Sequence, residues 1–143
     1  MQPLTLTRTY VGTSPERAWA AWTTPDGLLA WWWTHWPGVT CELDVRVGGA
    51  WQIVAPQQGI RVHGTYTEVE PTTRLGFTWV WADDGVDGPT EDILVVLSQA
   101  GEDVRLELAH AGMSSAEAGE NYRQGWEFVL DALDRHLSHN RGT

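Results

Sequence analysis

The sequence contains no lysine and only one cysteine. Nine arginines stand against 19 acidic residues, so the formal net charge is −10. A chain of this charge repels phosphate backbones, and we predict no nucleic acid partner. Cys41 alone cannot close an internal disulfide, which is typical of proteins from a reducing cytosol. It also cannot complete a four-ligand zinc set with His136 and His139, so we predict no metal and no cofactor.

Long hydrophobic runs are also missing. No segment approaches the roughly 18 consecutive apolar residues that a membrane-spanning helix requires. Residues 1–8 lack the basic start and the apolar core of an export signal. We therefore expect a cytoplasmic protein without a membrane span. A chain of this length is most simply one domain, which we predict to cover residues 1–143.

Tryptophan, in contrast, is abundant, with ten residues in a chain of 143. Phe77, Trp79 and Trp81 are spaced two apart in a segment that alternates like a β-strand. On a strand such residues project from one face, so they form an aromatic wall. This is more aromatic bulk than a small core normally requires. We predict that part of it lines a ligand cavity.

Alternating segments predict a sheet of about seven strands, the first of them at residues 5–11. Turn-forming residues separate the later strands, and the acidic segment 83–89 is predicted to be a solvated hairpin loop. Because all these connections are short, we expect antiparallel pairing. The six later strands are predicted at 40–47, 49–55, 60–69, 74–82, 91–99 and 103–111.

Two short helices are predicted between the first and second strands. Ser14-Pro15 and Thr24-Pro25 each combine a capping hydroxyl with a proline in the first helical turn. Pro37-Gly38 ends the second helical segment, since proline and glycine together break the helical pattern.

The last part of the chain predicts one long helix. It begins at a capping box formed by Ser114 and Glu117. The order of elements therefore predicts an α+β fold, in which a curved antiparallel sheet grips the C-terminal helix. The apolar stripe of this helix consists of Tyr122, Trp126, Val129, Leu130, Leu133 and Leu137.

Several motifs follow one another in a family-specific order. They are Ser14-Pro15-Glu16-Arg17-Ala18-Trp19, Trp31-Trp32, Asp44 with Gly48-Gly49-Ala50-Trp51, Gly64 with Glu68-Val69-Glu70-Pro71, Arg74-Leu75-Gly76-Phe77-Thr78-Trp79, and Gly125-Trp126. Together they resemble the bacterial homologues of the activator of heat-shock-protein-90 ATPase, in the START-like (SRPBCC) helix-grip superfamily. The resemblance implies a deep cavity between the sheet and the long helix, which related families use for lipids, hormones or polyketides.

The residues that face this cavity are expected on the strands and on the opposing helix stripe. For each aromatic residue, core packing is the alternative to ligand contact, and a register shift of one residue would turn a strand's side chains to the other face. We predict ligand contacts from Trp51, Ile53, Tyr66, Phe77, Trp79, Trp81, His110 and Trp126.

His110 is the weak candidate for a catalytic residue. Alternation places it on the same face as Leu106 and Leu108, so its ring should point inward. Either a neighbouring group satisfies its ring nitrogens, or it contacts the ligand and acts as a general acid or base. His63 shares a face with Thr65, and the alternation does not decide whether that face is the inner or the outer one.

Three consecutive tryptophans, Trp31, Trp32 and Trp33, cannot all face inward on a helix. We therefore predict that at least one is exposed. An exposed indole is typical of a cavity mouth, of a homodimer contact or of a surface for a protein partner.

These features favour a protein that binds a small hydrophobic or aromatic molecule. One alternative is an enzyme resembling polyketide cyclases and aromatases, in which His110 or another inward polar group moves a proton. The other is a co-chaperone-like interaction module that works through the tryptophan cluster 31–36 and binds a chaperone.

Overall fold

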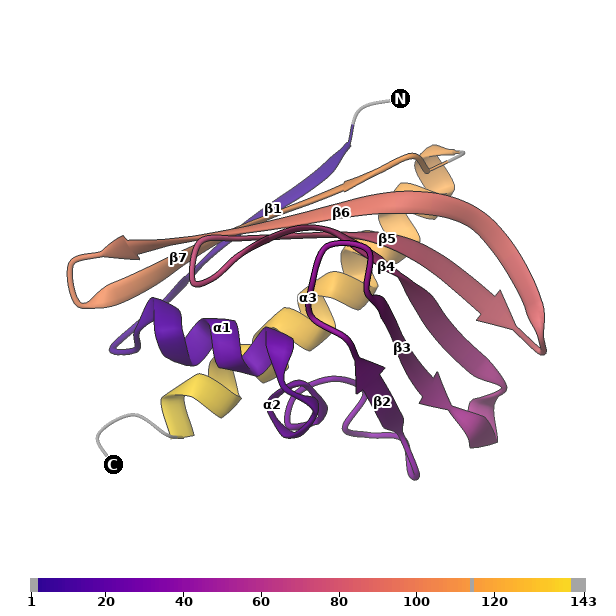
Figure 1. Ribbon diagram of the computed structural model, residues 1–143, viewed down its shortest axis with the longest axis horizontal. Helices are drawn as coiled ribbons and strands as arrows, with labels where there is room; N and C mark the ends of the chain where they lie inside the picture. The colour runs from indigo at the N-terminus through magenta and orange to yellow at the C-terminus, as the bar shows by residue number, and fades with distance from the viewer. Residues whose placement is uncertain (1–2, 114, 140–143) are drawn as a thin grey trace.

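The computed structural model describes residues 3–113 and 115–139. The strands are β1 (Leu4–Tyr10), β2 (Thr40–Leu43), β3 (Ala50–Ala55), β4 (Ile60–Glu70), β5 (Arg74–Asp83), β6 (Val86–Ala100) and β7 (Asp103–Ala111). Within the described residues these seven strands form one curved antiparallel sheet in the order β1-β7-β6-β5-β4-β3-β2. The helices pack on one side of it (Figure 1). The predicted α+β helix-grip fold is confirmed.

Two short helices follow β1 where the sequence predicts them. These are α1 (Pro15–Thr23) and α2 (Pro25–Leu29). The Ser14 hydroxyl accepts the N–H of Arg17 at 3.2 Å, and the Thr24 hydroxyl accepts the N–H of Gly27 at 3.1 Å. Each hydroxyl thus satisfies one of the free amides of a helix start. A short 3-10 helix, η1 (Pro56–Gln58), follows β3.

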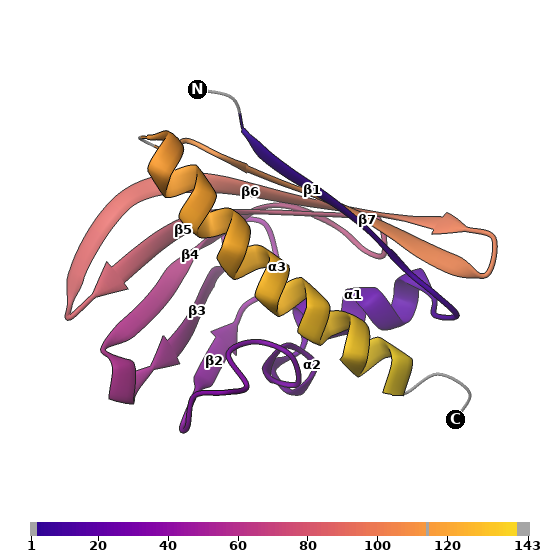
Figure 2. The same ribbon diagram turned by 180° about the vertical axis from the view of Figure 1, so that it is seen from behind.

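The long helix α3 (Ala116–His139) crosses the face of the sheet diagonally (Figure 2). Ser114, predicted as part of its capping box, lies outside the described residues; the Ser115 hydroxyl accepts the N–H of Ala118 at 3.1 Å. The Tyr10 hydroxyl donates to the carbonyl of Leu130 at 3.3 Å and ties α3 to β1. None of the helices within the described residues has an apolar stretch long enough to cross a membrane. The buried members of the predicted stripe are Trp126, Val129, Leu130, Leu133 and Leu137, whereas Tyr122 is half-buried.

The hairpin between β5 and β6 is tighter than predicted. The prediction of a loop over 83–89 is wrong, because the turn consists of Asp84 and Gly85 and Val86 already pairs with Asp83. Both turn residues have positive φ, 49° and 81°, which suits a two-residue hairpin turn. The glycine and proline at 88–89 therefore lie within β6 and not in a loop.

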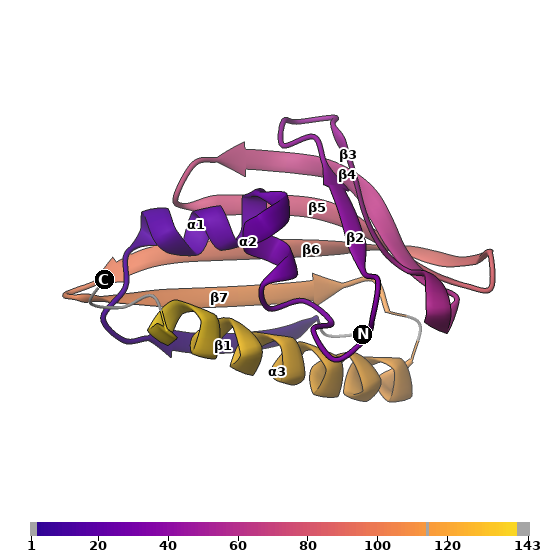
Figure 3. The ribbon, with the colours of Figure 1, turned by 90° about the horizontal axis from the view of Figure 1, so that it is seen from below.

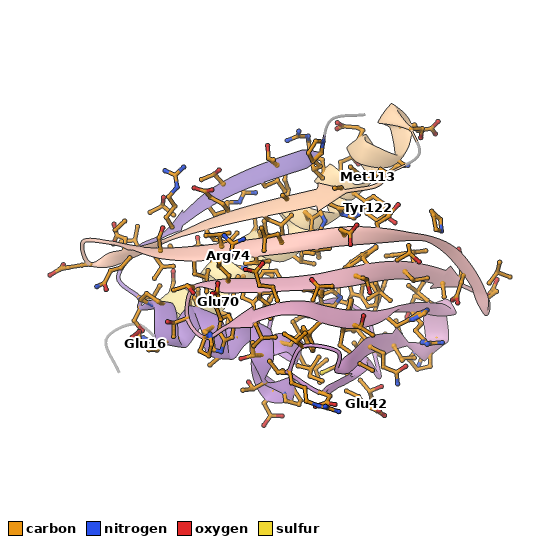
Figure 4. All side chains as sticks on the ribbon, turned by 45° about the horizontal axis from the view of Figure 1, so that its top comes forward. Glu16, Glu42, Glu70, Arg74, Met113 and Tyr122 are labelled. Carbon is orange, nitrogen blue, oxygen red and sulfur yellow. The ribbon has the colours of Figure 1, made fainter. Side chains whose placement is uncertain are left out.

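The outer face of the sheet, away from the helices, carries polar pairs. His63 lies on this face, where its Nε2 is 3.0 Å from Oδ1 of Asp87. The neighbouring Val62 points inward and is fully buried. Arg74 pairs with Glu68 at 2.6 Å and lies beside Glu70 (Figure 4). The structure thus assigns His63 to the outer face.

Strand β2 is shorter than the predicted 40–47, since it ends at Leu43. The chain turns immediately afterwards: the carbonyl of Asp44 accepts the N–H of Arg46 at 2.9 Å, and the carbonyl of Arg46 accepts that of Gly49 at 2.8 Å. Gly48 has a φ of 85°, and a Cβ on Gly49 would collide with the carbonyl oxygen of Asp44. The backbone at this turn therefore requires both glycines.

The tryptophan triplet is buried throughout. Trp31, Trp32 and Trp33 are 0%, 4% and 7% exposed, so the prediction of an exposed indole among them is wrong. Helix α2 ends at Leu29, and Trp33 has a φ of 49°, so the helical period does not apply to these residues. The argument for a homodimer contact through an exposed indole fails with that prediction.

Candidate functional site

A pocket of about 570 Å³ opens between the first half of α3, strand β5 and the segment that follows α2. Figure 3 shows this segment leaving α2 towards α3 before it returns to β2. Six indoles border the pocket, with a histidine, a tyrosine and a phenylalanine near them. The aromatic residues of its lining are Trp32, Trp33, His35, Trp36, Trp79, Trp81, Tyr122, Trp126 and Phe128.

Three of the predicted contact residues, Trp79, Trp81 and Trp126, line this pocket. The rings of Trp79 and Trp81 lie 6.5 Å apart and only 29° from parallel, as expected for neighbours on one strand face. Trp126 approaches Trp79 from α3 with a centroid distance of 5.3 Å. Trp79 and Trp81 of the predicted aromatic wall therefore face the helix stripe across the pocket.

Four other predicted contact residues lie deeper under the sheet. Trp51, Ile53, Tyr66 and Phe77 border a crevice of only about 20 Å³, room for about one water molecule. Trp51 contacts Phe77 at 5.2 Å between ring centroids and donates its N–H to the carbonyl of Thr78 at 3.1 Å. The structure brings these residues together as a packed layer, away from the larger pocket.

His110 is fully buried and does not belong to the lining of the pocket. The indole N–H of Trp126 donates to its Nδ1 at 3.0 Å, and its Nε2 is 2.9 Å from Oε1 of Glu91. Because an indole N–H can only donate, Nδ1 must accept, and the ring proton belongs on Nε2. Burial lowers the pKa of His110, although the hydrogen bond and charge of Glu91 oppose this. The ring is therefore neutral, and both of its nitrogens are satisfied.

Tyr122 contributes a hydroxyl group to the wall of the pocket. It lies on α3 (Figure 4). The indole N–H of Trp79 donates to its oxygen at 3.4 Å. Burial, with a smaller contribution from the charge and a hydrogen bond of Glu91, raises the pKa of Tyr122 to about 12, although the bond from Trp79 lowers it. At neutral pH the phenol is protonated and can serve as a hydrogen-bond donor.

Trp22 and Trp32 carry buried indole N–H groups without a hydrogen-bond partner among the described residues. Leaving such a donor unpaired costs about 1–3 kcal/mol. Trp32 borders both the pocket and the crevice, as Trp79 does, so the two indoles lie between these spaces.

The segment after α2 supplies lining residues that the predicted contact set does not include. Trp32, Trp33, His35 and Trp36 all come from it, and the His35 ring lies 4.8 Å from that of Trp36. A cavity mouth was one of the three interpretations of this cluster, and it is the one that agrees with the pocket. Phe128 lies off the predicted apolar stripe of α3, so helical periodicity gave no signal for it.

Metal ligation finds no support in the described residues. Among them, no group of three or more His, Cys, Asp or Glu side chains is placed to hold an ion. The side chain of His139, one of the two histidines considered with Cys41, lies outside the described part of the chain.

Residues 12–138 match the family model of activator of Hsp90 ATPase homolog 1-like proteins. The chain belongs to this family. Protein CV1439 from Chromobacterium violaceum is 26% identical with a TM-score of 0.78, over 96% of this chain and 98% of its own. The AHSA1 protein SPO3351 from Silicibacter pomeroyi is 28% identical with a TM-score of 0.76, over 95% and 97%.

A third similar structure is DynU16, a protein of the dynemicin biosynthetic locus. It has a TM-score of 0.81 over 99% of this chain and 49% of its own. At 19% identity this likeness shows the fold alone. No curated protein sequence matches the chain significantly.

Proposed function

We propose that the protein binds a small hydrophobic or aromatic molecule in the pocket between β5 and α3. The observation that carries this proposal is the pocket of about 570 Å³ bordered by six indoles. Sites for small molecules typically measure about 300–1,000 Å³ and are lined mainly by apolar side chains with a few polar groups. Tyr122 and Asn121 supply polar groups here.

Hydrophobic contact would provide most of the affinity. Each 100 Å² of apolar ligand surface removed from water contributes about 2.5 kcal/mol. The indoles of the lining favour an aromatic guest, because an aromatic pair in an offset-stacked or edge-to-face arrangement gains about 0.5–1.5 kcal/mol beyond its buried area. Because Trp33 and Trp79 are already buried without a guest, little side-chain entropy is lost on binding.

A cyclase-like enzyme remains the second proposal, and one observation favours it. Tyr122 borders the pocket, and its ring lies 4.4 Å from the ring of buried His110. In such an enzyme Tyr122 would meet the substrate, whereas His110 and Glu91 would only position its hydroxyl. The co-chaperone alternative would depend on the remaining part of the cluster 31–36, because Trp31, Trp32 and Trp33 are buried whereas Trp36 is half-buried.

The binding proposal is tested by filling the pocket from α3. Gly125 lines the pocket, and a Cβ added there meets no atom within 4 Å. Gly125→Leu should therefore fold normally, because leucine favours a helix over glycine by close to 1 kcal/mol. The matched control is Gln124→Leu, since Gln124 is exposed and outside the lining.

Binding is measured by indole fluorescence with a panel of apolar and aromatic compounds. We expect Gly125→Leu to weaken the best ligand at least tenfold and Gln124→Leu to leave it unchanged. Unchanged affinity in Gly125→Leu, or no binding by any compound of the panel to the natural chain, would contradict the proposed site.

A further inference from the structure

We infer that the ligand is an organic cation, with an apolar or aromatic body that carries a quaternary or protonated amine. This inference rests on the proposed function and specifies the ligand class of the same pocket. Three features of the described residues support it: the arrangement of the indoles, a buried carboxylate behind the wall, and the distribution of basic residues.

The indoles at the mouth of the pocket stand at steep angles to one another. The ring of Trp33 lies 5.8 Å from that of Trp81 at 82°, and 5.0 Å from that of Trp36 at 50°. All three rings belong to the lining of the pocket, so several indoles surround one space. The face of an indole carries negative electrostatic potential, and indole attracts cations more strongly than the other aromatic side chains.

A carboxylate lies behind this aromatic wall. Glu91 is 3% exposed, and its Oε1 lies 2.9 Å from Nε2 of His110, whose ring is neutral because Trp126 donates to its Nδ1. The negative charge of Glu91 is therefore not cancelled by its partner. Tyr122, which lies between this pair and the pocket, is a neutral phenol. A cation in the pocket would gain from the carboxylate in a poorly solvated environment.

The basic residues do not favour the opposite charge. The chain has no lysine, and its formal net charge is −10. No arginine belongs to the lining of the described pocket, and the titratable base in that lining is His35 at the mouth. An anionic ligand would meet indole faces and a buried carboxylate, with no arginine or lysine of the lining to pair with it. The volume of about 570 Å³ far exceeds a bare ammonium group, so an apolar body must fill the rest.

The test uses two probes of the same shape. 3-Hydroxyphenyltrimethylammonium and 3-tert-butylphenol differ in one atom, a positive nitrogen against a neutral carbon. Isothermal titration calorimetry up to millimolar probe should give at least tenfold tighter binding of the cation. Equal or tighter binding of the neutral phenol overturns the inference and leaves the proposed function standing. The inference is also overturned if the cation does not bind, and the apolar panel above then decides whether the pocket binds anything.

A variant pair separates cation recognition from hydrophobic contact. Trp81 lines the pocket and is only partly buried, so its replacement should be tolerated. Trp81→Leu keeps an apolar side chain without a π face, and Trp81→Phe keeps a weaker face. We expect Trp81→Leu to weaken the cation at least fivefold and the tert-butyl probe less than twofold, with Trp81→Phe in between. An equal loss for both probes overturns the inference, and thermal unfolding checks that each variant is folded.

Discussion

Two spaces under the sheet are both lined by tryptophan, but they differ greatly in volume. The outer one, between β5 and α3, measures about 570 Å³, whereas the inner crevice measures about 20 Å³. Trp32 and Trp79 border both. The number of aromatic residues therefore does not decide where a small molecule has room.

What decides it is the element on the opposite side. In the inner region, Trp22 of α1 and Leu28 of α2 fill the space against Trp51. In the outer region, α3 presents Ala118 and Gly125, which have little or no side chain. These two residues are seven apart, so they lie on the same side of the helix. Small residues on a helix leave a pocket open in front of an aromatic wall.

The strongest test of this comparison removes one phenylalanine from each region. Phe77→Ala in the inner layer should lower the free energy of unfolding by about 3–5 kcal/mol, because it leaves a cavity in a packed core. Phe128 is 49% exposed at the pocket mouth, so Phe128→Ala should change stability by only about 0.5 kcal/mol. Urea denaturation of both variants measures the difference. Similar losses in both would mean that the mouth is as much a part of the core as the inner layer.

The stability of the protein should depend on pH through His110, which accepts a hydrogen bond from Trp126 of the pocket wall. Burial lowers the pKa of His110 in the folded state. As the pH falls below about 6.5, the unfolded chain takes up a proton that the native ring resists, so unfolding becomes more favourable. The stability that the native chain owes to a neutral His110 is present above this pH and is lost below it, at up to about 1.4 kcal/mol per pH unit.

His110→Gln removes this titration and keeps both hydrogen bonds possible, since its amide can accept from Trp126 and donate to Glu91. We expect the variant to lose less stability than the natural chain between pH 7.5 and 5.5, as measured by urea unfolding. Parallel curves for the two proteins would show that His110 is not the group responsible.

The sequence predicted the fold better than the site, for a physical reason. Alternation fixes which face of a strand a residue occupies, so the inward direction of His110 is confirmed. It does not fix what lies opposite, and Phe77 and Trp81 share a face of β5 yet border different spaces. The pocket in front of Trp81 stays open because Gly125 of α3 lies opposite, and the position of Gly125 relative to β5 depends on how the helix packs on the sheet.

Two local predictions failed because pairing and backbone conformation override residue preferences. Gly88 and Pro89 are typical turn residues, yet they lie in β6 because the hairpin closes tightly at Gly85. Trp33 adopts a left-handed conformation that a large side chain rarely takes, which allows the whole triplet 31–33 to be buried.

The smallest expected effect concerns the two neighbouring indoles Trp31 and Trp32. Trp31 donates its N–H to the carbonyl of Ala21 at 2.9 Å, whereas the N–H of Trp32 is buried without a partner among the described residues. Replacing either tryptophan with phenylalanine removes the same side-chain volume. Trp31→Phe also breaks a hydrogen bond and leaves a buried carbonyl unpaired, whereas Trp32→Phe removes an unsatisfied donor. We therefore expect Trp31→Phe to be less stable than Trp32→Phe by about 1 kcal/mol in urea denaturation. The reverse order would mean that the Trp32 N–H has a partner, such as a bound water in the inner crevice.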